Sequence, residues 1–142
     1  MPNIYIPKAL KSLIEKRANR CCEYCRNQRA FASHSFHFEH IIPKSNGGKT
    51  VAKNMAYACG GCNNHKYTKT SGLDSFSKKM APLFNPRKQT WSEHFIWNED
   101  HTLIIGTTPT GRATLNILKL NREGLPNLRR VLKAAGKHPP SF

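Results

Sequence analysis

Four of the five cysteines stand in two closely spaced pairs. These are Cys22-Glu23-Tyr24-Cys25 and Cys59-Gly60-Gly61-Cys62, with residues 26–58 between them. Four thiolates at this spacing can close a tetrahedral shell around zinc, and a site made of four cysteines leaves no position open for water. The sequence therefore predicts a structural zinc site. Two disulfides or four unrelated buried thiols are the alternatives, but an odd number of cysteines fits a disulfide framework poorly.

Cys21 is the cysteine left over from these pairs. We expect it to be a small buried side chain, which is the common role of a free cysteine. Cys21 and Cys25 as the first two metal ligands are the less regular alternative to Cys22 and Cys25.

A second group of polar residues lies inside and just after the segment that the cysteine pairs bracket. Glu39 and His40 precede Pro43, a Gly47-Gly48 pair and Asn54, and Asn63 directly follows Cys62. A metal shared by the two cysteine pairs would bring Asn63 close to the segment that carries Glu39, His40 and Asn54. An imidazole titrates near neutral pH and can act as a general base. In a regular strand, however, Glu39 and His40 point to opposite faces. Unless the strand twists or ends there, His37 is the rival base because it shares a face with Glu39.

The motifs of residues 20–67 together resemble the HNH endonuclease family, in its zinc-bearing, four-cysteine branch. They are Glu39-His40-Ile41-Ile42-Pro43, Gly47-Gly48, Asn54 and Cys62-Asn63-x-x-Lys66, preceded by the first Cys-x-x-Cys pair. The resemblance implies a ββα-metal fold that cuts DNA phosphodiester bonds and leaves 5′-phosphate and 3′-hydroxyl ends.

The same resemblance implies a role for each polar residue. His40 would be the general base that activates water, and Asn54 would hold the loop that follows it. Glu39 and Asn63 would be ligands of a divalent ion bound to the scissile phosphate. A carboxylate and an amide oxygen are hard ligands, which favours Mg²⁺ or Mn²⁺ as the catalytic ion.

The charge of the chain points to a polyanionic partner. Against 23 Lys and Arg the chain has 8 Asp and Glu, a net charge of +15, and nucleic acid is the commonest partner of such a surface. In the last helix, Leu125, Leu128 and Leu132 form an apolar stripe separate from the basic residues. We place Lys66 on an exposed helix face, where the alternative to a phosphate contact is a side chain that is only solvated. The predicted DNA contacts are Lys44, Lys49, Lys66, Arg112, Arg129, Arg130 and Lys133.

Apolar spacing and turn residues predict a small α+β protein. The expected helices cover 8–20, 59–69, 109–121 (with Thr108 as N-cap and Pro109 first) and 124–136, and the expected strands cover 36–42, 54–58, 91–97 and 102–107. Residues 70–89 have the composition of a loop. We expect residues 1–69 to form the zinc-stapled ββα-metal core. Residues 70–142 would add a hairpin and two helices packed on it, giving one compact domain.

The sequence thus predicts a zinc-stapled, Mg²⁺- or Mn²⁺-dependent DNA endonuclease. It has no apolar run long enough to span a membrane and no signal-peptide pattern at its N-terminus, so we expect a cytoplasmic protein. Monomer and homodimer are both open, and nicking cannot be separated from double-strand cutting. One rival is a non-catalytic zinc-stapled module that binds nucleic acid, and another is a zinc-stapled protein that binds an acidic protein partner.

Overall fold

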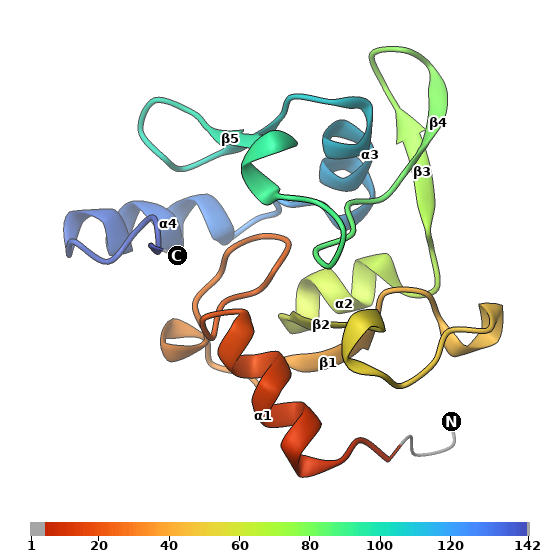
Figure 1. The fold of residues 1–142 in the computed structure, drawn as a ribbon. Helices are drawn as coiled ribbons and strands as arrows, with labels where there is room; N and C mark the ends of the chain where they lie inside the picture. The colour runs from red at the N-terminus through yellow and green to blue at the C-terminus, as the bar shows by residue number, and fades with distance from the viewer. Residues whose placement is uncertain (1–4, 142) are drawn as a thin grey trace.

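The computed structural model describes residues 5–141 and has an α+β architecture, as predicted (Figure 1). Within these residues the strands form three antiparallel hairpins, β1–β2, β3–β4 and β5–β6. The helices are α1 (Lys8–Arg17), α2 (Gly60–Lys66), α3 (Pro109–Leu118) and α4 (Leu125–Ala134). The strands are β1 (His37–His40), β2 (Met55–Ala58), β3 (Ser71–Asp74), β4 (Lys79–Pro82), β5 (Phe95–Trp97) and β6 (Ile104–Gly106).

The β1–β2 hairpin followed by α2 is the strand–strand–helix unit that the sequence predicts. His37 pairs with Ala58 and His40 with Met55, so the two strands match along their whole length. All four residues of β2 are buried, which explains why this strand is apolar throughout rather than alternating. The hairpin thus places the end of β1 and the start of α2 at fixed positions in the core.

Buried side chains of both halves of the chain form one cluster. Ile14 of α1 and Tyr57 of β2 belong to it, as do Phe84, Ile104 and Leu118 from the second half. The indole nitrogen of Trp91 also donates a hydrogen bond to the carbonyl oxygen of Tyr24, at 2.9 Å. The first Cys-x-x-Cys pair is therefore tied directly to the C-terminal half.

The β3–β4 hairpin lies where the sequence predicts a loop, and this prediction is wrong. The inward residues of β3 are Gly72 and Asp74, which are types depleted in strands, while Leu73 points outward. Gly72 is required because a Cβ there would lie 2.4 Å from a side-chain carbon of Ile117. Asp74 is held by Arg112. Neither residue produces the hydrophobic alternation that identifies a strand.

Helix α3 begins where the sequence predicts but ends earlier, and the strand expected at residues 91–97 is also shorter. Thr108 caps α3 as predicted, accepting a hydrogen bond from the backbone nitrogen of Gly111 at 3.0 Å, with Pro109 first in the helix. The helix stops at Leu118 because Lys119 adopts a left-handed conformation, with φ of 50°. Trp91 lies on a short 3₁₀ turn before β5 rather than in the strand.

Candidate metal centre and catalytic site

The four paired cysteines form a buried cluster. Their sulfur atoms lie within 4.8 Å of one another, and no other group of three or more His, Cys, Asp or Glu in residues 5–141 comes together in this way. Two of these sulfurs, those of Cys25 and Cys59, are 3.6 Å apart. A tetrahedral zinc site with Zn–S bonds of ~2.3 Å needs sulfur separations of about 3.8 Å. The donor set and its spacing therefore fit a structural zinc ion.

Arg122 covers the outer side of this cluster, and no sequence pattern indicated it. Its guanidinium donates to the sulfur of Cys59 at 3.2 Å and to that of Cys62 at 3.5 Å. A Cβ on Gly61 would lie 2.4 Å from the same guanidinium, so a larger residue at this position would have to displace the Arg122 side chain. The cation offsets part of the negative charge that four thiolates bring.

Cys21 lies outside the cluster. It is buried, and its thiol donates to the carbonyl oxygen of Asn19 at 3.3 Å. Burial raises the pKa of this thiol to about 11, so it is protonated at neutral pH. The expectation of a buried small side chain agrees with this placement.

His40 is the last residue of β1, and its ring is partly exposed. Its Nε2 atom lies 2.8 Å from the hydroxyl of Thr50, a residue that the sequence analysis did not select. Burial lowers the pKa of His40, and the positive charges of Lys44 and Lys66 lower it further. The imidazole is therefore neutral at pH 7, the state that a general base requires.

Asn54 joins the two ends of the loop between β1 and β2. Its side-chain oxygen accepts from the backbone nitrogen of Ile42 at 2.9 Å, and its amide donates to the carbonyl oxygens of Ile42 and Lys49 at 3.0 and 2.9 Å. Gly48 lies inside this loop, where a Cβ would be 1.7 Å from the oxygen of Ile42. The loop that carries Thr50 is thus fixed against the end of β1.

Glu39 points to the opposite face of β1, toward α2. Its carboxylate forms an ion pair with Lys66 at 2.5 Å and accepts from the hydroxyl of Tyr24 at 2.7 Å. Burial raises the pKa of Glu39, and these two partners act against that rise. His37, the rival base on this face, is exposed at the start of the strand. Glu39 and His40 therefore lie on opposite sides of β1.

Lys66 does not lie on an exposed helix face, so its predicted phosphate contact is wrong. It is 1% exposed and also donates to the carbonyl oxygen of Ile41 at 3.0 Å. The reason is helical spacing: Lys66 is four residues after Cys62 and shares its buried face. Its ammonium supplies the counter-charge for Glu39 in the interior.

Asn63 lies on α2, half-buried, three residues before Lys66. Among the described residues its side chain makes no hydrogen bond, so its amide oxygen is free to take a ligand. Residues three apart are neighbours on a helix surface, so Asn63 and Lys66 are adjacent on α2. A divalent ion held by Glu39 and Asn63 would have to displace Lys66 from the carboxylate.

A cleft of about 280 Å³ opens next to this ion pair. Ile41, Ile42 and Lys66 line one side, and Asn85 and Lys88 of the C-terminal half line the other. The C-terminal half therefore contributes to the surroundings of the candidate site, although His40 does not line this cleft.

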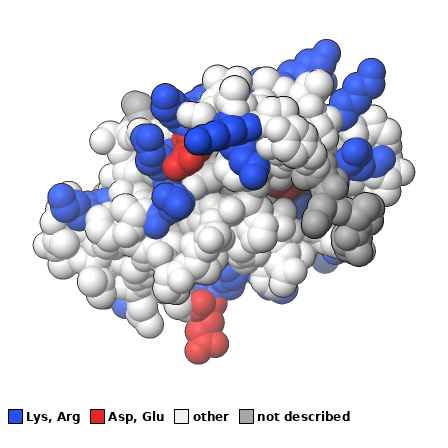
Figure 2. All heavy atoms as spheres, turned by 90° about the horizontal axis from the view of Figure 1, so that it is seen from below, with Lys and Arg blue, Asp and Glu red and all other residues white. Residues whose placement is uncertain are grey.

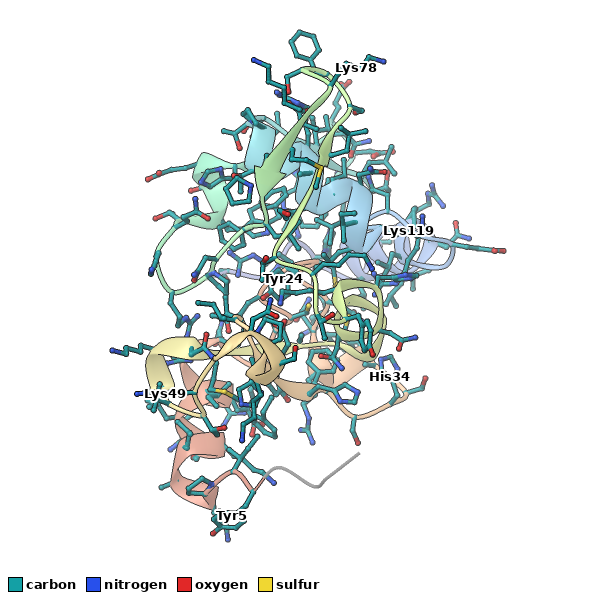
Figure 3. The ribbon with its side chains drawn as sticks, turned by 90° about the vertical axis from the view of Figure 1, so that its right-hand side faces the viewer. Tyr5, Tyr24, His34, Lys49, Lys78 and Lys119 are labelled. Carbon is teal, nitrogen blue, oxygen red and sulfur yellow. The ribbon has the colours of Figure 1, made fainter. Side chains whose placement is uncertain are left out.

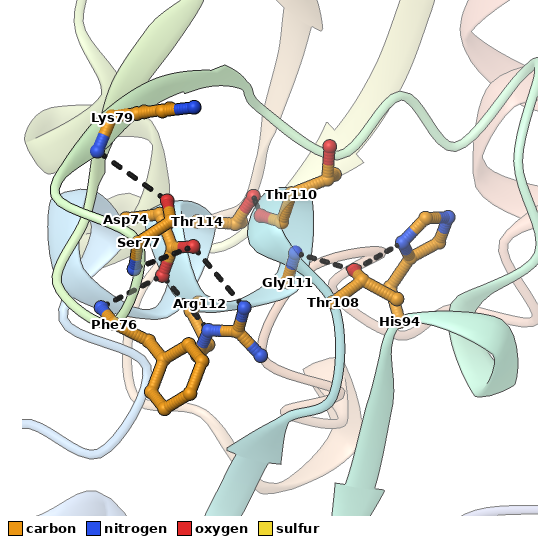
Figure 4. Close-up of polar contacts among 10 residues, drawn as sticks. All are labelled: Asp74, Phe76, Ser77, Lys79, His94, Thr108, Thr110, Gly111, Arg112 and Thr114. Atoms are coloured by element: carbon orange, nitrogen blue, oxygen red, sulfur yellow. Dashed lines mark hydrogen bonds and ion pairs between the residues drawn. The ribbon is translucent and has the colours of Figure 1, made fainter.

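Two predicted DNA contacts in the C-terminal half are engaged by other groups of the protein. Arg112 binds Asp74 through two hydrogen bonds, at 2.8 and 3.1 Å (Figure 4). The Arg112 guanidinium holds the pKa of the Asp74 carboxyl well below its usual range. Arg129 is 4% exposed and donates to the carbonyl oxygens of Thr102 and Leu120.

The prediction for Arg129 is therefore wrong, and helical spacing gives the reason. Arg129 lies four residues after Leu125 and three before Leu132, so it belongs to the packed face of α4. Arg130 and Lys133 of α4 remain exposed, and so do Lys44 and Lys49 of the loop after β1.

Comparison with known proteins gives one family. The model of a family described as HNH endonuclease matches residues 22–79, which contain both Cys-x-x-Cys pairs, His40, Asn54 and Asn63. No curated protein matches the chain. In the part of the chain that the structure describes, no helix is long and apolar enough to cross a membrane. The four-cysteine cluster and the β1–β2–α2 unit agree with this match, so residues 22–79 are similar to HNH endonucleases.

Proposed function

We propose that this protein is a metal-dependent endonuclease that hydrolyses DNA phosphodiester bonds and leaves 5′-phosphate and 3′-hydroxyl ends. The observation that carries the proposal is the His40 imidazole, which Thr50 positions within the segment that matches HNH endonucleases. Neither a binding module nor an interaction protein needs such a residue.

The role proposed for His40 is to take a proton from the attacking water. When Nε2–H donates to the Thr50 hydroxyl, Nδ1 carries the free lone pair and acts as the base. Asn54 holds the backbone at Ile42 and at Lys49, on either side of the intervening loop, so Thr50 stays opposite the ring. Placing the base in this way contributes typically 10²–10⁴-fold to a hydrolytic rate.

The metal proposed for the reaction is Mg²⁺ or Mn²⁺. Glu39 and Asn63 would hold it, since their oxygens are the hard ligands that these ions prefer. Because β1 ends at His40, an ion on Glu39 and the His40 imidazole could meet one phosphate at the end of the strand, although the two side chains leave opposite faces. When bound, the ion would neutralise charge on that phosphate and on the leaving oxygen. Lys66 is the present partner of the Glu39 carboxylate and would have to give way to the ion.

A plasmid-cleavage assay tests the proposal. The zinc-loaded protein is incubated with supercoiled plasmid and Mg²⁺ or Mn²⁺, beside the His40→Ala variant. We expect nicked or linear products that a DNA ligase can reseal, and no cutting by the variant. Cutting with Zn²⁺ but not with Mg²⁺ or Mn²⁺ would contradict the metal assignment. Tight DNA binding without cutting would favour the non-catalytic binding module.

A further inference from the structure

Helix α1 carries an exposed basic face that the family match does not include. Lys8, Lys11 and Lys16 are exposed, whereas Ile14 is buried against the core. Figure 2 views the molecule from the side on which α1 lies in Figure 1 and shows Lys and Arg gathered there with few acidic residues. The helix ends before residue 22 and therefore lies outside the segment that matches HNH endonucleases.

Neither ion pairs nor the helix dipole accounts for these lysines. The first turn of α1 has no acidic residue, and Lys8 and Lys11 stand at the helix end where the macrodipole disfavours positive charge. In the described part of the chain, none of the three lysines forms an ion pair with a carboxylate. The nearby Glu15 is instead shared by Arg20 and Arg29, at 3.6 and 3.8 Å.

The basic face of α1 lies beside the His40 side of β1. The ammonium of Lys11 is 5.6 Å from the centre of the Phe38 ring. Phe38 and His40 are two residues apart, so they share a face of the strand and are separated by about 7 Å along it. Helix α1 thus flanks the face of β1 that carries the candidate base.

The loop after β1 continues this positive surface. Lys44, Lys49 and Lys53 are exposed or partly exposed there, and α1 packs against the turn Ala52–Asn54. In Figure 3, Lys49 lies toward the same end of the molecule as Tyr5, which precedes α1, whereas Lys78 lies at the opposite end. We define the α1 surface as the side chains of Lys8, Lys11, Lys16, Lys44, Lys49 and Lys53.

We propose that the α1 surface binds the phosphate backbone of duplex DNA next to the scissile phosphate at His40. This inference rests on the proposed nuclease function and names the part of the chain that holds its substrate. A helix of 10 residues is about 15 Å long, which spans about four successive phosphates of one strand measured along the duplex axis. The helix supplies positive charge along this length, and His40 faces the DNA at its side.

Fluorescence anisotropy with a labelled duplex of about two helical turns tests the α1 surface. The zinc-loaded protein is compared with a Lys8→Gln/Lys11→Gln/Lys16→Gln variant at several KCl concentrations, without Mg²⁺ or Mn²⁺. We expect binding weaker by roughly tenfold or more near physiological salt. The plot of log K for DNA binding against log salt concentration should become less steep by about 2.7, because about 0.9 counterions are released per phosphate contact.

A second triple variant removes the same charge elsewhere. Lys78→Gln and Lys79→Gln lie in the β3–β4 hairpin and Lys119→Gln lies just after α3, all at exposed positions. This control should bind DNA within about threefold of wild type, and both variants should melt at the wild-type temperature. Equal losses in the two variants would overturn the α1 surface, since net charge alone would then explain binding.

Three further outcomes separate the two proposals. Plasmid cutting by wild type together with unchanged DNA binding by the α1 variant would overturn the α1 surface and leave the nuclease intact. Lysine-dependent DNA binding without any cutting would support the surface and contradict the nuclease. Equally tight, equally lysine-dependent binding of poly-glutamate would overturn the assignment of this surface to nucleic acid.

Discussion

Thr50 determines how the ring of His40 is oriented. The hydroxyl lies 2.8 Å from Nε2, and the loop that carries it is fixed by Asn54. Loss of this contact would let the ring rotate and would leave the choice of tautomer to solvent. In the proposed mechanism Thr50 is thus a positioning residue, whereas His40 is the group that would meet the water.

Replacing Thr50 by Val should lower kcat about tenfold and leave KM for DNA nearly unchanged. A hydrogen bond to a group that becomes charged contributes ~1.5–3 kcal/mol, and about 1.4 kcal/mol corresponds to a factor of ten in rate. Thr50→Ser keeps the hydroxyl and should restore most of the rate. Steady-state kinetics of both variants checks this. A wild-type rate in the Val variant with a loss in the Ser variant would mean that the methyl group, and so packing, is what matters.

At the scale of elements, the ion pair between Glu39 and Lys66 joins β1 to α2. Both side chains are almost fully buried, with 5% and 2% of their surfaces exposed. Lys66 also donates to the carbonyl oxygen of Ile41, so the pair fixes the strand end that follows His40. Removing one partner leaves the other charged and uncompensated in the interior.

Lys66→Met should therefore lower the free energy of unfolding by about 3 kcal/mol, which corresponds to a fall of ~10 °C in Tm for a chain of this size. The double variant Lys66→Met/Glu39→Gln should recover part of this loss, because no buried charge remains. Thermal melting followed by circular dichroism measures both. A double variant less stable than Lys66→Met alone would refute the internal counter-charge role.

The element scale also shows what could be predicted from the sequence. The β1–β2–α2 unit and the capped start of α3 were predictable because apolar runs, the Cys-x-x-Cys spacing and Thr108-Pro109 carry local signals. The β3–β4 hairpin was not, because its inward residues Gly72 and Asp74 depend on partners in α3.

Part of the candidate site could also be predicted from the sequence. The four-cysteine cluster is present as expected, and Asn54 spans the loop that follows His40. Thr50 and Arg122 could not be selected, since both act through contacts across the fold that no local motif records. Lys66 and Arg129 were assigned to exposed faces because basic side chains are rarely buried unless paired.

At the scale of the whole molecule, we propose that residues 1–69 and 70–142 fold as one unit around the zinc site. The support is the single buried cluster and the contact of Arg122, from the second half, with two of the cysteine sulfurs. Apparent zinc-binding energies in small zinc domains reach ~10–16 kcal/mol, comparable to the whole stability of a domain.

Removal of zinc should therefore unfold both halves in one transition. A strong chelator or Cys62→Ser should abolish the cooperative melt, and the near-ultraviolet signal of Trp91 and Trp97 in the second half should be lost with it. Cys21→Ser is the matched control and should keep one equivalent of zinc, since Cys21 lies outside the cluster. A C-terminal half that retains its tryptophan signal after chelation would contradict the single unit.

The central claim is that His40 performs the chemistry of DNA hydrolysis. The most direct measurement is the single-turnover cleavage rate of His40→Ala with Mg²⁺ or Mn²⁺, taken together with its affinity for the same DNA. We expect a loss of at least ~100-fold in rate, with affinity within about twofold of wild type. Cleavage by His40→Ala at the wild-type rate would contradict it.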